Sequence, residues 1–299
     1  MNAPYKHPLR NGVSASCVVT PDGHWPTLLD FLSERFPSVT RERWQQRMQT
    51  GEVQDHLGQP LLPGQIFSGG TRIYYYRAVD AEIPIPHEAE TISVDANLLV
   101  VDKPHFLPVI PSGKYLQETL LVRLRRQFGN EAISPIHRID RDTAGLVLFA
   151  MTHASRNAYQ ELFRKRQVKK VYEAIAPWKP SLEWPQSRST HICTGRHFMQ
   201  QCESEGPVNA ITTITPIEVR DTIARYRLEP VTGQRHQLRV HMAALGIPIL
   251  NDGIYPTLTP ESHDYLKRPL QLLAKELEFI DPWSGALRKF HSRRSLNFS

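Results

Sequence analysis

The 299-residue chain is 40% hydrophobic and 22% charged, which allows one large core or a large core with a smaller one. Its net charge of +6 suits a polyanionic partner, and no apolar run approaches the ~20 residues of a membrane-spanning helix. The three cysteines have no C-x-x-C spacing, which argues against a disulfide framework and a cysteine zinc site. We therefore expect a cytoplasmic protein with reduced thiols and no membrane contact.

The first predicted module covers residues 25–77 and follows an N-terminal extension, residues 1–24, that lacks the apolar core of a signal peptide. Pro26 is expected in the first turn of one helix, and Thr40 is expected to cap a second. Apolar spacing and turn residues predict helices over residues 28–36 and 41–48, and strands near Val53, near Leu61 and over residues 71–76.

The second predicted helix of this module is basic, with Arg41, Arg43 and Arg47 along it. Two helices, a small sheet and a basic second helix together resemble the S-four RNA-binding domain. The resemblance implies that these three arginines contact RNA. The alternative is a small packing domain with ordinary surface arginines.

Residues 78–86 contain two prolines and are interpreted as a linker, which leaves residues 87–299 as a second, larger domain. In this domain helices and strands are mixed without regular alternation, which favours an α+β fold with a mostly antiparallel sheet. The predicted strands are 96–104, 146–150, 168–176, 212–217 and 223–229, and the predicted helices are 116–128, 154–166 and 236–245.

Five charged or titratable side chains lie within residues 137–142, directly before a turn at 143–145 and the apolar strand 146–150. A carboxylate at the mouth of a buried strand is partly desolvated and fixed in position, as catalysis requires. In isolation, Asp140 and Asp142 also fit an ordinary turn with solvated arginine partners.

The full run H-R-I-D-R-D-T-A-G-L-V-L-F-A resembles the signature H-R-L-D-x-x-T-S-G-L-L-L-F-A of the RluA family of RNA pseudouridine synthases. The resemblance implies that Asp140 is the catalytic nucleophile or base. It also implies that His137 and Arg138 contact the RNA and that Arg138 fills the space left by a flipped base.

Two further segments extend the resemblance. Lys169-Lys170-Val171-Tyr172-Glu173-Ala174 is similar to the family motif K-x-Y-x-A, which implies that Tyr172 stacks on the target uracil. The two lysines are candidate phosphate contacts, and the alternative is solvated surface charge. The segment T-G-Q-R-H-Q-L-R-V-H is similar to T-G-R-[ST]-H-Q-[IL]-R-V-H, which implies that Arg239 pairs with the catalytic aspartate and that Leu238 lines the uracil pocket. Two departures are visible: Gln234-Arg235 replaces the family's Arg-Ser/Thr, and Asn251 replaces the glycine before Asp252.

Known members of this family have a twisted mixed sheet with the active cleft across its middle. The resemblance therefore implies an isomerase that converts uridine to pseudouridine in ribosomal or transfer RNA. Because no redox change occurs and no external group is added, neither a metal nor another cofactor is expected. The target base is expected to flip out of its stack, and a monomer is the default.

Two alternatives from other classes remain at this point. A metal-dependent hydrolase would use His137, Asp140, Asp142, His236 and His241 as ligands, although no H-E-x-x-H spacing occurs. A catalytically silent RNA-binding protein would explain the basic charge and the first module, but it would not need Asp140, Tyr172 and Arg239 together.

Overall fold

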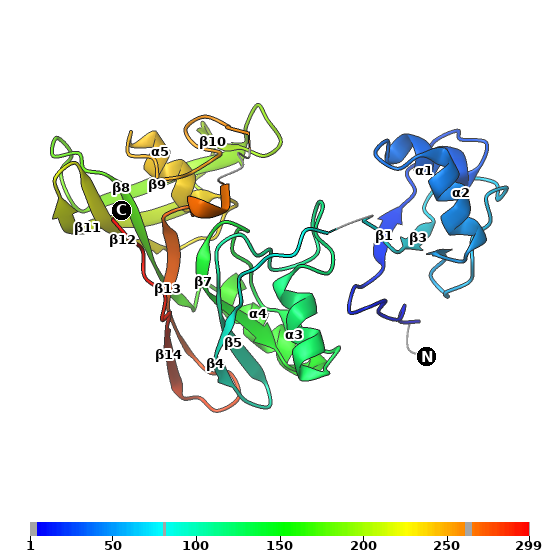
Figure 1. Ribbon diagram of the computed structural model, residues 1–299, viewed down its shortest axis with the longest axis horizontal. Helices are drawn as coiled ribbons and strands as arrows, with labels where there is room; N and C mark the ends of the chain where they lie inside the picture. Colours follow the sequence, from blue (N-terminus) through cyan, green and yellow to red (C-terminus); the bar gives the residue numbers. More distant parts are fainter. Residues whose placement is uncertain (1–4, 80–81, 261–264, 299) are drawn as a thin grey trace. The chain divides into compact units, whose positions relative to one another are not determined.

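The computed structural model describes residues 5–79, 82–260 and 265–298 (Figure 1). By internal contacts the chain divides into two compact units. The first contains Met1–Glu82 and Pro111–Gln117, and the second contains Ile83–Ile110 and Glu118–Ser299.

The first unit has two helices and a small antiparallel sheet, ordered β1-β3-β2. Its core includes Phe31, Leu32, Trp44, Met48 and Ile73. The elements are β1 (Ser16–Val19), α1 (Leu28–Arg35), α2 (Arg41–Gln49), β2 (Val53–Gln54) and β3 (Arg72–Tyr75).

Two expectations for this unit need correction. Pro26 lies outside α1, because Thr27 is the N-cap and forms a capping box with Asp30. Strand β1 lies within residues 1–24, the expected extension, and pairs with β3 along its whole length. The folded unit therefore begins before Trp25. The cap of α2 at Thr40 is as predicted.

The second unit is built on one sheet of eleven strands, ordered β10-β9-β11-β12-β8-β13-β7-β5-β4, with β14 on β13 and β6 on β7. Among the described strands only β13 and β7 pair in parallel, which confirms the mostly antiparallel α+β prediction. The strands are β4 (Glu90–Val94), β5 (Leu98–Lys103), β6 (Ser134–Pro135), β7 (Ala144–Ala150), β8 (Lys169–Pro177), β9 (Gln186–Thr194), β10 (Gln201–Ser204), β11 (Ala210–Arg220), β12 (Ile223–Pro230), β13 (Leu272–Ile280) and β14 (Leu287–His291).

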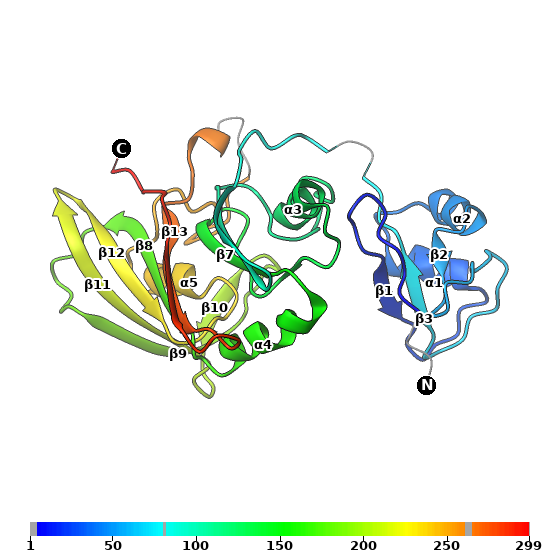
Figure 2. The ribbon, with the colours of Figure 1, turned by 90° about the horizontal axis from the view of Figure 1, so that it is seen from below.

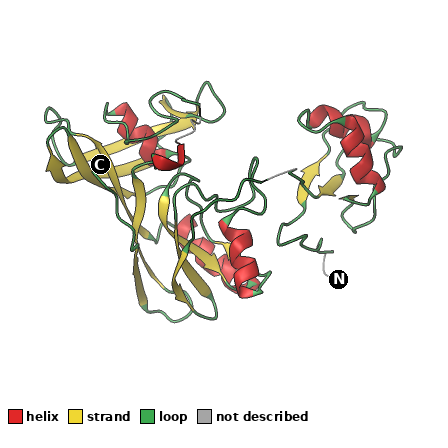
Figure 3. Ribbon diagram, in the orientation of Figure 1, coloured by secondary structure: helices red, strands yellow, loops and turns green. Residues whose placement is uncertain are grey.

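The helices of this unit are α3 (Leu120–Phe128), α4 (His153–Arg164) and α5 (Gln237–Ala244), with a short 3-10 helix η1 (Tyr265–Lys267). Helix α4 packs on β6 and β7, whereas α5 packs on β10 and β11. Figure 2 shows the same division from a second direction: α3 and α4 lie at one half of the sheet and α5 at the other. Figure 3 shows that this unit contains more strand than helix. No described helix has the length and apolar character needed to cross a bilayer.

Strand β7 begins at Ala144, so the expected turn at residues 143–145 is wrong for its last two positions. Gly145 has a positive φ of 111°, and a Cβ there would lie 2.3 Å from the carbonyl oxygen of Ala274. Only glycine permits the close approach of β7 to β13 at this point. This approach fixes the start of β7, directly after the loop that carries Asp140, against β13.

The sequence analysis did not predict several of the strands, among them β9, β10, β13 and β14. Strand β9 is largely polar, Q-S-R-S-T-H-I-C-T, and only one of its residues is buried. Cys193 on β9 lies opposite Cys202 on β10, with the two Sγ atoms 3.6 Å apart. All three cysteines are free thiols.

Candidate active site

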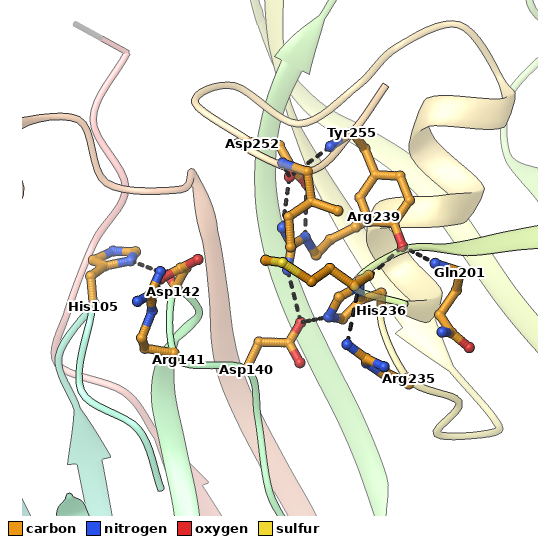
Figure 4. A network of polar contacts seen from close by, with 12 residues as sticks. His105, Asp140, Arg141, Asp142, Gln201, Arg235, His236, Arg239, Asp252 and Tyr255 are labelled. Carbon is orange, nitrogen blue, oxygen red and sulfur yellow. Dashed lines mark hydrogen bonds and ion pairs between the residues drawn. The ribbon is translucent and has the colours of Figure 1, made fainter. Parts of the chain in front are cut away.

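Asp140 lies in the loop before β7, and Arg239 lies on α5. The Nη1 group of Arg239 donates a hydrogen bond of 3.2 Å to Oδ2 of Asp140 (Figure 4). The Asp140 side chain is 31% exposed, whereas that of Arg239 is 3% exposed. The predicted contact between the two motifs is therefore present, with a buried guanidinium beside a carboxylate that substrate can reach.

A second carboxylate, Asp252, holds the same guanidinium. It accepts hydrogen bonds from Nε of Arg239 at 2.8 Å and from Nη2 at 2.6 Å, and its side chain is fully buried. Burial opposes the charge of Arg239, but the pairing with Asp252 and Asp140 raises its pKa, so the arginine stays a cation. The sequence analysis noted the segment around Asp252 as a departure and assigned Asp252 no role. A buried arginine requires a buried acid, and that requirement could have pointed to Asp252.

His236 approaches Asp140 from the start of α5. Its backbone is left-handed, with φ 55°, and its Nε2 lies 3.8 Å from Oδ2 of Asp140. The other ring nitrogen, Nδ1, is 3.0 Å from the hydroxyl of Tyr255, which itself accepts a hydrogen bond from the backbone N–H of Gln201. Burial lowers the pKa of His236, although the Asp140 carboxylate opposes this shift.

Tyr172 lies on β8, which is the middle strand of the sheet order. It packs against the apolar cluster that contains Leu238, so the two predicted pocket residues lie in one cluster. Burial raises the pKa of the Tyr172 hydroxyl, and the nearby charge of Asp140 raises it further. Tyr172 is therefore a protonated, largely buried ring close to Asp140.

Hydrogen bonds and an ion pair hold the loop that carries Asp140 in place. Lys103, fully buried at the end of β5, donates hydrogen bonds of 2.9 Å to the carbonyl groups of Pro104 and Arg141. Burial lowers the pKa of Lys103 to about 7. Asp142 is paired with Arg141 at 2.9 Å and accepts a hydrogen bond from the Tyr265 hydroxyl. These contacts fit the interpretation of Asp142 as a residue of the turn.

His137 and Lys170, both predicted to contact RNA, form hydrogen bonds within the protein. Nε2 of His137 accepts the backbone N–H of Leu148 at 3.1 Å, and its ring stacks on Phe163. Burial lowers the pKa of His137 to about 3, so the ring is neutral. Nζ of Lys170 donates to the carbonyl of Thr232 at 2.6 Å, and burial lowers its pKa to about 8. His137 is therefore a structural residue, and Lys170 ties β8 to the loop before α5.

Other basic residues from the sequence analysis differ in their exposure. Arg138 and Lys169 are exposed. In the first unit, Arg41 pairs with Asp30 at 2.6 Å and is half-exposed, and Arg43 is partly exposed. Arg47 is 6% exposed and lies over the Trp44 ring, which leaves little of its side chain accessible.

The remaining polar residues of the α5 segment hold the fold together. Gln237 is buried and hydrogen bonds to Ile211, Thr212 and Thr232. His241 is buried between two threonine hydroxyls, and burial lowers its pKa to about 4. Arg235 donates to the carbonyl groups of Phe198 and Met199, so its displaced charge anchors the turn between β9 and β10. Within the described ranges, no group of three or more His, Cys, Asp or Glu residues could hold a metal ion.

Comparison with known proteins agrees with this geometry. The family model for RNA pseudouridylate synthase matches residues 97–244, which include Asp140, Tyr172 and Arg239. The dual-specificity RNA pseudouridine synthase RluA of Haemophilus influenzae is 30% identical over 213 residues, which cover 70% of this chain and 95% of that protein. The chain belongs to the RNA pseudouridine synthase family.

Other similar proteins include an uncharacterized RNA pseudouridine synthase of Synechocystis, 28% identical over 76% of this chain and 79% of the relative. Among solved structures, human RNA pseudouridylate synthase domain containing 4 has a TM-score of 0.55 and 25% identity, covering 70% of this chain and 89% of that one. This RNA pseudouridine synthase is an isomerase that acts on RNA, which decides against the hydrolase and the silent RNA-binding protein.

Proposed function

We propose that this pseudouridine synthase isomerises specific uridines in structured ribosomal or transfer RNA, with Asp140 as the nucleophile or base. The observation that carries the proposal is the Asp140–Arg239 ion pair beside the partly buried Tyr172 ring. A partly exposed carboxylate next to an aromatic surface suits attack on a nucleoside whose base is held against that surface.

In the proposed reaction the bond between N1 of uracil and C1′ of ribose breaks, and a bond between C5 and C1′ replaces it. The hydrogen on C5 leaves as a proton, and N1 gains one, so atoms balance without an oxidant or a second substrate. Asp140 acts on the ribose or the base, Tyr172 stacks on the uracil, and Leu238 lines the pocket. The Tyr172 hydroxyl lies near Asp140, and we propose that it helps to relay the proton from C5; because its pKa is raised, it stays protonated and does not act as a phenolate base.

A uridine in a base-paired stack is inaccessible to a group on a protein loop, so the target must be flipped out. Arg138 is exposed directly beside the Asp140 loop, and its planar guanidinium is suited to fill the vacated space in the stack. Lys169 and the exposed arginines of α2 are proposed phosphate contacts. We further propose that the protein works as a cytoplasmic monomer and needs no metal.

The decisive experiment maps pseudouridines in all stable RNAs of the source organism, with and without this gene, by carbodiimide-adduct primer extension. Purified protein should then restore the missing sites in unmodified RNA, both with and without EDTA. Failure of folded protein on every stable RNA would overturn the proposal. Activity that EDTA abolishes and zinc or manganese restores would contradict the metal-free mechanism.

A further inference from the structure

Arg239 offers a planar fork of N–H groups, and its geometry allows a carboxylate to bind through both oxygens at once. In this structure Asp252 is the residue that binds in this way, through Nε and Nη2 of Arg239 (Figure 4). Of the N–H groups that Asp252 leaves unused, Nη1 donates to Asp140, and it reaches only Oδ2.

The consequence concerns the second oxygen of Asp140. His236, like Arg239, approaches Oδ2, and no described residue is recorded as a hydrogen-bond donor to Oδ1. With the side chain 31% exposed, Oδ1 is the oxygen that remains free to meet a substrate. Had Arg239 bound Asp140 through two hydrogen bonds, both oxygens would have been occupied.

Asp252 also organises the chain that follows it. Its Oδ1 accepts the backbone N–H groups of Ile254 at 2.8 Å and Tyr255 at 3.1 Å. This turn places the Tyr255 hydroxyl against Nδ1 of His236. Both groups that face Oδ2 of Asp140 therefore depend on Asp252.

We propose that Asp252 is a positioning residue of this enzyme: by binding the Nε–Nη2 edge of Arg239, it fixes the orientation of the guanidinium so that Nη1 alone meets Asp140 and one carboxylate oxygen stays free for the reaction. The inference rests on the proposed role of Asp140.

The test uses the full chain and Asp252→Asn, whose amide oxygen can keep the turn to residues 254 and 255 while the charge is lost. Crystal structures of wild type and variant should show that Arg239 has rotated to hold both oxygens of Asp140 in the variant. If Arg239 still gives Asp140 a single hydrogen bond, the proposal is wrong. This readout does not depend on activity, so it separates failure of the inference from failure of the proposed function.

The kinetic arm measures the single-turnover rate on saturating RNA. Asp252→Asn should lower the rate by about a hundredfold, the scale of a misplaced reacting group, with RNA affinity unchanged within about threefold. Because Asp252 acts through Arg239, the double variant Asp252→Asn with Arg239→Lys should be no slower than Asp252→Asn alone. Losses that multiply in the double variant would instead indicate a purely structural role and would overturn the proposal.

Asp252→Ser is the second variant, because its hydroxyl can also accept the backbone N–H groups of the turn. If Asp252→Asn does not fold, the crystal structure and the single-turnover rate are measured on Asp252→Ser, and the same outcomes decide the proposal.

Discussion

Replacing Arg239 with lysine keeps the positive charge and removes the planar fork. Arg239 makes three hydrogen bonds to carboxylates, two to Asp252 and one to Asp140. A lysine ammonium group is a single point on a flexible stem and cannot reproduce all three. Loss of the contact with Asp140 leaves this carboxylate free to rotate, and a displacement of ~1 Å at a reacting centre costs about a hundredfold in rate, or about 2.7 kcal/mol.

The same substitution also affects folding. From the sequence, little effect is expected, because Leu238 and Val240 keep their packing. The buried pair with Asp252 changes this expectation: one charged hydrogen bond on a fully buried carboxylate is lost, at about 1.5–3 kcal/mol of unfolding free energy. Urea denaturation of wild type and variant measures this loss.

The rate is measured in single turnover on saturating RNA, with Arg235→Lys as the matched control. Arg235 is exposed, and among the described residues it hydrogen bonds to the carbonyl groups of Phe198 and Met199, one of which lysine can still reach. The control should therefore stay within about threefold of wild type. Equal losses in the two variants would refute the assignment of Arg239 as the partner of Asp140.

Three further predictions follow from the described contacts. Asp140→Asn should fold and bind RNA but lose activity, whereas Asp142→Asn should lower mainly stability, by about 1–3 kcal/mol; the opposite order in a single-turnover assay would exchange their roles. Replacing Arg41 and Arg43 with glutamine should reduce the slope of log Kd against log salt by roughly 1.5 to 2, and an unchanged slope would show that α2 does not meet phosphate. Burial lowers the pKa of His137 from 6.5 to about 3, so the unfolded chain takes up a proton first as the pH falls, and stability should decrease from about pH 6.5 towards pH 3. His137→Gln, which can still accept the Leu148 N–H, should flatten that decrease in denaturation measured at each pH.

The amino-acid sequence by itself determined the elements whose patterns are local. The cap of α2 at Thr40 and the buried strands β5 and β7 follow from side chains that are neighbours in the chain. Family motifs also indicated the pair Asp140–Arg239, although 99 positions separate the two residues. Here the sequence pattern carried information that periodicity alone cannot carry.

Only the tertiary structure decided how the polar residues are used. His137 and Arg47 look like available cations in the sequence. In the folded chain, His137 accepts the backbone N–H of Leu148, and Arg47 packs over the Trp44 ring. Polar strands such as β9 lack a one-dimensional pattern because their place in the sheet depends on partners far along the chain. The role of Asp252 depends on three-dimensional geometry: a buried guanidinium must be neutralised, and only the folded chain brings two carboxylates to opposite edges of Arg239.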